Sequence, residues 1–84
     1  IKKDISFKTK LHITCLDKAG TLHEITETIA KENINILDVK TDVNVGGSAD
    51  IWIVCNVKDL ESLNSLIKSI TKLKNVDAVE RVFS

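Results

Sequence analysis

The segment at residues 49–57 constrains the fold of this chain more than any other feature. It is apolar on two faces: Ala49, Ile51, Ile53, Cys55 and Val57 alternate with residues that include Trp52 and Val54. A strand that is apolar on both faces is typical of the interior of a sheet, where neighbouring strands flank it. The sequence therefore predicts a sheet of several strands with this segment in its middle.

Three more segments are predicted to be strands. Residues 10–16 alternate, with Leu11, Ile13 and Cys15 on one face and His12 and Thr14 on the other, as in a half-buried strand. Residues 36–43 form a second strand, in which positions 37, 39, 41 and 43 are expected to share a face. Gly46-Gly47 predicts a hairpin turn between this strand and residues 49–57. Residues 76–83 are predicted to form the last strand, with a less regular pattern.

Two amphipathic helices separate these strands. Residues 21–32 carry apolar side chains at helical spacing, and Thr21 with Glu24 is expected to form a capping box at the start of this helix. Residues 60–73 form the second helix, with Asp59 as its N-cap. The predicted core stripe of the second helix is Leu60, Leu63, Ile67 and Ile70, with Leu66 and Leu73 beside it.

The order strand, helix, strand, strand, helix, strand predicts an α+β fold. Right-handed crossovers place both helices on one face of a four-stranded antiparallel sheet with strand order 4-1-3-2, the ferredoxin-like βαββαβ sandwich. The other face of the sheet carries His12, Thr14 and Trp52 and has no layer to cover it, so we expect these three residues to form an interface with a partner.

Composition predicts one cytoplasmic domain. The 84 residues form a single domain, of which residues 1–9 are expected to be a flexible lead-in, and the chain starts at Ile1 rather than Met, as expected of a piece of a longer protein. Twelve basic and twelve acidic residues leave no net charge, which weakens the case for nucleic-acid binding through overall electrostatics. No apolar run has membrane-spanning length, and the two cysteines are expected to be reduced thiols of a cytosolic core.

The residues offer no recognisable catalytic site. The Ser, His and Asp residues follow no nucleophile-elbow spacing, and His12 and His23 lie on different elements without a metal-ligand pattern, so no catalytic residue, metal or cofactor is predicted. RNA-recognition domains share this element order, but they use aromatic residues on the open sheet face, where Trp52 is the only candidate.

The first loop, residues 17–20, allows two interpretations: a ligand-binding site or a purely structural turn. A turn containing Gly20 that runs into a helix exposes backbone N–H groups suited to a small carboxylate, and Asp17 could meet an ammonium group. Alternatively, Gly20 only makes the turn and Asp17 only caps it, because glycine is common in turns for steric reasons.

The residues of this loop and of the C-terminal part resemble a known family. Asp17-Lys18-Ala19-Gly20-Thr21-Leu22-His23-Glu24-Ile25-Thr26 is similar to the ACT-domain signature Asp-Arg-Pro-Gly-Leu-Leu-x-Asp-Ile-Thr, and Asn33-Ile34-Asn35-Ile36 is similar to the opening of strand two in that family. The tail, with its leucine-rich helix and the segment Val76-Asp77-Ala78-Val79-Glu80-Arg81, resembles the end of RelA/SpoT-type GTP pyrophosphokinases, the (p)ppGpp synthetase/hydrolases.

This resemblance implies a non-catalytic regulatory domain that controls catalytic domains upstream of it. ACT domains bind small ligands, usually amino acids, at a homodimer interface between the first loop of one chain and strand two of the other. Carried over, the ligand-binding residues would be Asp17, Lys18, Ala19, Gly20, Thr21 and Leu22 on one side and Asn35 on the other. Lys18, Ala19 and Thr21 depart from the signature, and without proline the loop is less preorganised.

Two other functions remain open at this level. One is an amino-acid-binding ACT domain of another metabolic enzyme or regulator. The other is a ligand-free module that contacts protein or RNA, for example on the ribosome.

Overall fold

The computed structural model describes residues 7–16 and 18–82, which form four strands and two helices. In chain order the elements are β1 (Phe7–Cys15), α1 (Lys18–Lys31), β2 (Asn35–Val43), β3 (Ala49–Val57), α2 (Leu60–Thr71) and β4 (Val76–Val82).

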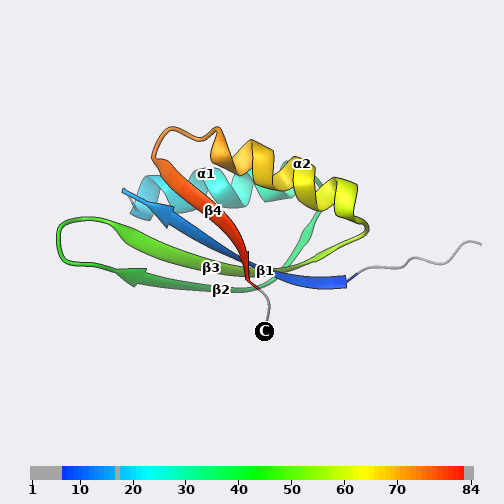
Figure 1. Cartoon of the computed structure of the whole chain (residues 1–84), viewed down its shortest axis with the longest axis horizontal. Helices are drawn as coiled ribbons and strands as arrows, with labels where there is room; N and C mark the ends of the chain where they lie inside the picture. The colour runs from blue at the N-terminus through cyan, green and yellow to red at the C-terminus, as the bar shows by residue number, and fades with distance from the viewer. Residues whose placement is uncertain (1–6, 17, 83–84) are drawn as a thin grey trace, which may run out of the picture.

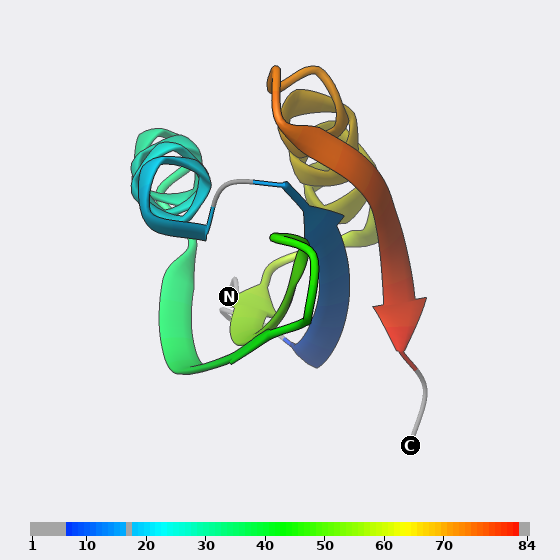
Figure 2. The same ribbon diagram turned by 90° about the vertical axis from the view of Figure 1, so that its left-hand side faces the viewer.

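The strands form one antiparallel sheet in the order β2-β3-β1-β4, and both helices lie on the same side of it (Figures 1 and 2). Read from the other edge, this is the order 4-1-3-2, so the predicted ferredoxin-like α+β fold is confirmed. The doubly apolar strand β3 lies between β1 and β2, as its sequence required.

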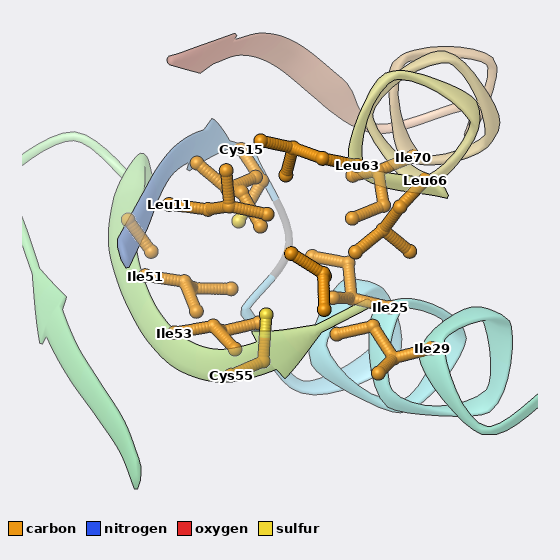
Figure 3. Close-up of a cluster of buried hydrophobic side chains, with 13 residues drawn as sticks. Leu11, Cys15, Ile25, Ile29, Ile51, Ile53, Cys55, Leu63, Leu66 and Ile70 are labelled. Carbon is orange, nitrogen blue, oxygen red and sulfur yellow. The ribbon is translucent and has the colours of Figure 1, made fainter. Parts of the chain in front are cut away.

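The core fills the space between the sheet and the two helices (Figure 3). The inward faces of β1 and β3 meet apolar side chains from α1 and α2 there. The fully buried members include Leu11, Ile13, Ile51 and Ile53 from the strands, and Ile25, Ile29, Leu63, Leu66 and Ile70 from the helices. Cys15 and Cys55 also lie in this core as free cysteines, and burial raises the pKa of the Cys55 thiol.

Local hydrogen bonds fix the start of α2, as predicted, and the end of α1, while α2 ends at Thr71 rather than at the predicted residue 73. The Asp59 carboxylate accepts a hydrogen bond from the backbone N–H of Ser62 at 2.7 Å and thereby caps α2. At the end of α1, Asn33 adopts φ 59°, and the N–H groups of Asn33 and Ile34 bond the carbonyls of Ala30 and Ile29. This pattern is a Schellman motif, and it turns the chain from α1 into β2.

The first residues of β1 and of α1 differ from the sequence prediction. β1 begins at Phe7, so residues 7–9 of the expected flexible lead-in belong to the sheet, because Phe7 packs against the core and Thr9 is buried. Residues 1–6 lie outside the described residues. α1 begins at Lys18 rather than Thr21, so Gly20 stands in the first helical turn.

The apolar stripe of α2 is rotated relative to the predicted one. Leu63, Leu66 and Ile70 are fully buried, whereas Ile67 is only partly buried and Leu60 is 58% exposed. Leu66, which was expected beside the stripe, therefore lies at its centre. Leu60 is the first residue of α2, directly after the N-cap Asp59, and only from Leu63 onward does the helix bury its apolar side chains.

Strand β2 contains an irregularity that the alternation of its sequence does not reveal. Its register with β3 shifts between Ile36 and Asp38, so Leu37 is an extra residue. Ile36, Val39, Thr41 and Val43 pair with the inward-facing residues of β3, so the predicted shared face holds for positions 39, 41 and 43, whereas Leu37 lies in the irregularity and is 45% exposed. The β2–β3 turn has the predicted glycines, with φ 102° at Gly46 and 96° at Gly47.

Within the described residues, neither helix is long and apolar enough to cross a membrane.

Candidate functional site

The start of α1 presents exposed backbone at the position of the predicted ligand loop. Ala19 and Gly20 are exposed, and both stand in the first helical turn, whose N–H groups have no acceptor within the helix. Asp17 lies outside the described residues, and of Lys18 only the helical backbone is described. The structure thus keeps the donor groups that the sequence indicated, but it supplies them from a helix rather than from a turn.

Thr21 and Leu22 point toward the interior rather than the solvent. Thr21 is fully buried, and its hydroxyl oxygen has no hydrogen-bond partner. The predicted capping box of Thr21 and Glu24 does not form, because Thr21 lies inside the helix. Leu22 is partly buried against the core.

Asn35 lies at the opposite end of α1 from Gly20. Since α1 has 14 residues, its two ends are about 20 Å apart at the helical rise of roughly 1.5 Å per residue. One chain therefore does not bring Gly20 and Asn35 to the same small ligand, and the two could share one only across two chains.

Asn35 lines a hollow of about 360 Å³ where α1 leads into β2 and β3 leads into α2. These two connections lie toward the right of Figure 1. We call this hollow the Asn35 hollow. Its walls carry both charges and several amides: Glu32, Asn33, Ile34, Asn35, Asn56, Lys58 and Ser62. Among the described residues Glu32 and Lys58 form no ion pair, so a carboxylate could meet Lys58 and an ammonium group could meet Glu32.

Among these lining residues, the sequence indicated only Asn35 as a ligand-binding residue. Asn56 and Lys58 become neighbours of Asn35 through the β2–β3 register, in which Asn35 pairs with Asn56. Counting back from the hairpin turn would pair Asn35 with Val57. The extra residue at Leu37 shifts the register by one position, so Asn35 pairs with Asn56 instead.

The open face of the sheet holds a polar cluster around His12. The His12 ring stacks on the Trp52 ring of the neighbouring strand, with the two ring centroids 4.9 Å apart and the two ring planes 12° from parallel. His12 Nε2 lies 2.9 Å from Asp50 Oδ1, and Nδ1 lies 3.6 Å from Glu80 Oε1. Since a carboxylate oxygen only accepts, Nε2 carries the proton of the shorter contact.

Asp50 has a second partner that the sequence did not suggest. The side-chain amide of Asn44, from the β2–β3 turn, donates to Asp50 Oδ2 at 3.0 Å. The hydrogen bonds from Asn44 and then His12 lower the pKa of Asp50 below its usual 3.8. Thr14, the third predicted interface residue, pairs with Asp50 across β1 and β3 and is partly buried.

Comparison with known proteins identifies the family. The model of the ACT domain family matches residues 3–81. An ACT domain-containing protein of the UPF0735 group from Clostridium kluyveri is 36% identical over 70 residues, which cover 82% of this chain and 48% of that protein. A GTP pyrophosphokinase from Myxococcus xanthus is 27% identical over 82 residues, covering 98% of this chain and 11% of that protein.

The same relation appears among solved structures. The ACT domain of a GTP pyrophosphokinase from Chlorobium tepidum superposes with a TM-score of 0.81 and 27% identity, covering 93% of this chain and all of that one. The chain spans about half the length of the Clostridium relative and about a tenth of the Myxococcus enzyme. With its fold, its first-loop signature and the match over residues 3–81, the chain belongs to the ACT domain family.

Proposed function

We propose that this ACT domain is the regulatory part of a GTP pyrophosphokinase and controls (p)ppGpp synthesis and hydrolysis in response to a small ligand, an amino acid. The observation that carries the proposal is the close superposition on the ACT domain of a GTP pyrophosphokinase over the whole of that domain. The match to the Myxococcus enzyme over nearly all of this chain supports the same relation.

An ACT domain of this kind acts on a reaction without taking part in it. The pyrophosphoryl transfer would take place in other domains of a cytoplasmic parent protein. Coupling then requires that the domain, or its ligand, interacts more strongly with one state of the parent than with the other.

The proposed ligand is an amino acid because the Asn35 hollow offers partners for both of its charged ends. Lys58 and the amides suit a carboxylate, and Glu32 suits an ammonium group. In a homodimer, the exposed first turn of α1 from the second chain, at Ala19 and Gly20, would add backbone N–H donors to the same site.

The edge strand β2 is the proposed dimer surface. Four large apolar side chains are exposed on it and on the following turn: Leu37, Val39, Val43 and Val45. An edge strand with exposed apolar residues favours pairing with another strand. Asn35 begins this strand, so pairing there would place the hollow beside the second chain.

A titration with amino acids followed by backbone amide NMR tests the ligand. Valine, isoleucine, leucine and a panel of other amino acids are added to the labelled domain at a concentration that favours the dimer. We expect saturable shifts at Gly20, Thr21 and Asn35 for at least one of them. An absence of saturable shifts at all three positions would contradict amino-acid sensing and favour a module that contacts protein or RNA.

A matched pair of variants tests the contribution of α1. Gly20→Val places a side chain over the first-turn donors and should abolish the shifts, whereas Ala30→Val, at another exposed position of α1, should leave them. Equal ligand affinity in both variants would exclude Gly20 from the site.

A second function is supported by a specific observation. Sequence identity is higher to the UPF0735 protein of Clostridium kluyveri, at 36%, than to the Myxococcus enzyme, at 27%. The alternative is therefore an ACT domain that regulates a different parent protein.

Expression of the complete gene product distinguishes between the two proposed kinds of parent protein, a GTP pyrophosphokinase and a different regulated protein. The measurement is pyrophosphoryl transfer from ATP to GTP, and hydrolysis of the product, with and without the amino acid that binds. Synthesis or hydrolysis that changes with the amino acid is the expected result. A complete gene product without either activity would overturn the pyrophosphokinase proposal and leave the second one.

A further inference from the structure

A second, smaller hollow lies on the open face of the sheet, away from the Asn35 hollow. Its volume is about 130 Å³, and it is lined by Lys10, Lys40, Asp42 and Trp52, from three adjacent strands. We call it the Trp52 hollow. Lys40 pairs directly with Trp52 across β2 and β3, and Asp42 follows two residues later on the same face of β2.

The indole that lines this hollow is held in place from one side. His12, on the β1 side of Trp52, stacks on its ring and is itself held by a hydrogen bond to Asp50. Lys40 and Asp42 belong to β2, on the other side of β3. The structure therefore presents an ordered aromatic surface whose orientation does not have to be fixed on binding, which lowers the entropic cost for a flat ligand.

The two lysines of the hollow are available to an anion. Among the described residues, neither Lys10 nor Lys40 forms an ion pair, whereas Asp50 is hydrogen-bonded to His12. Asp42 is also without an ion-pair partner among those residues, and it can accept hydrogen bonds from a ligand. The hollow thus combines an aromatic plane, two cations and one acceptor.

We propose that the Trp52 hollow binds a nucleotide, with its base stacked on Trp52 and its phosphate beside Lys10 and Lys40. Asp42 accepts a hydrogen bond from an exocyclic amine of the base or from a ribose hydroxyl. A simple phosphate would leave the indole unused, and an apolar ligand would leave two ammonium groups without a counter-charge. The nucleotide is either free or an unpaired residue of an RNA, since both present the same base and phosphate.

Intrinsic fluorescence tests this proposal directly, because Trp52 is the only tryptophan of the chain. AMP, GMP, CMP and UMP are titrated into the domain, with adenosine and inorganic phosphate as partial ligands. Since stacking and phosphate contacts each contribute to binding, we expect saturable quenching by at least one mononucleotide and binding weaker by about tenfold or more for each partial ligand. If none of the four mononucleotides quenches the fluorescence saturably, the proposal is overturned.

Variants assign the binding to this hollow. The double change Lys10→Gln/Lys40→Gln should weaken nucleotide binding by about tenfold or more, because it removes the charges that face the phosphate. The matched control Lys68→Gln/Lys72→Gln removes two exposed lysines from α2 and its C-cap, and it should leave binding unchanged. Equal effects of the two pairs would place the nucleotide elsewhere.

The aromatic part is tested with Trp52→Leu, followed by amide NMR because this variant has no tryptophan. Loss of nucleotide-induced shifts along β2 and β3 is expected, with the spectrum of the free variant serving as the check that it is folded. If Trp52→Leu does not fold, Lys10→Gln/Lys40→Gln and its control still decide the outcome.

The two sources of the nucleotide are distinguished by a short unstructured RNA. Binding of the RNA at least about tenfold tighter than of the corresponding mononucleotide assigns the site to RNA, and equal affinity per site assigns it to a free nucleotide. The amino-acid titration monitors Gly20, Thr21 and Asn35, so failure of either proposal is recognised independently of the other.

Discussion

Asp50 illustrates how single residues organise the open face. Its two carboxylate oxygens accept hydrogen bonds from different elements, His12 on β1 and Asn44 in the turn after β2. These contacts lower the pKa of Asp50. A carboxyl group whose pKa is lower in the folded state stabilises the fold fully above its unfolded value of about 3.8, and this stabilisation is lost as the pH falls through the lower folded value.

Asn44→Ala should therefore raise the pKa of Asp50, because Asn44 is the largest cause of its lowering. The measurement is a pH titration of the Asp50 carboxyl carbon by NMR. Asn64→Ala, an exposed position on α2, serves as the control and should leave this pKa unchanged. A pKa of Asp50 that stays the same in Asn44→Ala would mean that the hydrogen bond does not persist in solution.

Thr21 is the residue whose sequence interpretation differs most from its environment. A threonine before a helix suggests a cap, but earlier helix initiation places Thr21 in the interior, with a hydroxyl oxygen that has no partner. The helix start is hard to predict here because Asp17 and Thr21 are both favoured capping residue types, and the Thr21–Glu24 spacing favours the later start.

Thr21→Val should leave the free energy of unfolding unchanged or raise it, because it removes a buried polar group and keeps the shape of the side chain. Thr21→Ser should lower it by about 1 kcal/mol, since a buried methyl group is lost. Urea unfolding of both variants provides the measurement. A clear loss of stability in Thr21→Val would show that the hydroxyl does have a partner.

At the scale of elements, the alternation of β1 and β3 was sufficient to predict which of their faces meets the helices. Ala49–Val57 has the predicted bounds, because a strand with apolar residues on both faces and a neighbouring strand at each edge leaves little ambiguity. β2 was less predictable, since an extra residue at Leu37 keeps a period of two in the sequence while the register changes. Helix α2 had enough leucines and isoleucines to allow two stripes, and only packing selects between them.

Leu66→Ala should cost about 2–5 kcal/mol of unfolding free energy, because Leu66 is fully buried at the centre of the α2 stripe. Ile67→Ala should cost clearly less, since Ile67 is partly exposed. Chemical denaturation of the two variants under the same conditions compares them. A larger loss for Ile67→Ala would mean that α2 is rotated toward the stripe that the sequence suggested.

At the scale of the whole molecule, four of the exposed large apolar side chains lie along the β2 edge and its turn: Leu37, Val39, Val43 and Val45. The sequence predicts an interface at His12, Thr14 and Trp52 on the open face; these residues are partly buried, and an interface there stays a prediction. The predicted order 4-1-3-2 already placed β2 at an edge, but the alternation of its sequence did not show that Leu37, Val39 and Val43 would be exposed there.

Val39→Lys should shift the domain toward the monomer, because it puts a charge in the middle of the exposed edge strand. Leu60→Lys, an exposed apolar position on α2, is the matched control and should not change the association state. Sedimentation equilibrium over a range of concentrations measures both. Unchanged self-association in Val39→Lys would move the dimer interface away from β2.

The length of α1 has a consequence for how such a domain would respond inside a cell. Because Gly20 and Asn35 stand at opposite ends of this helix, a ligand that needs both must bridge two molecules, and binding and assembly then strengthen each other by mass action. The threshold at which the amino acid is detected would fall as the number of protein copies rises. Expression level would set the sensitivity of the response alongside the chemistry of the pocket.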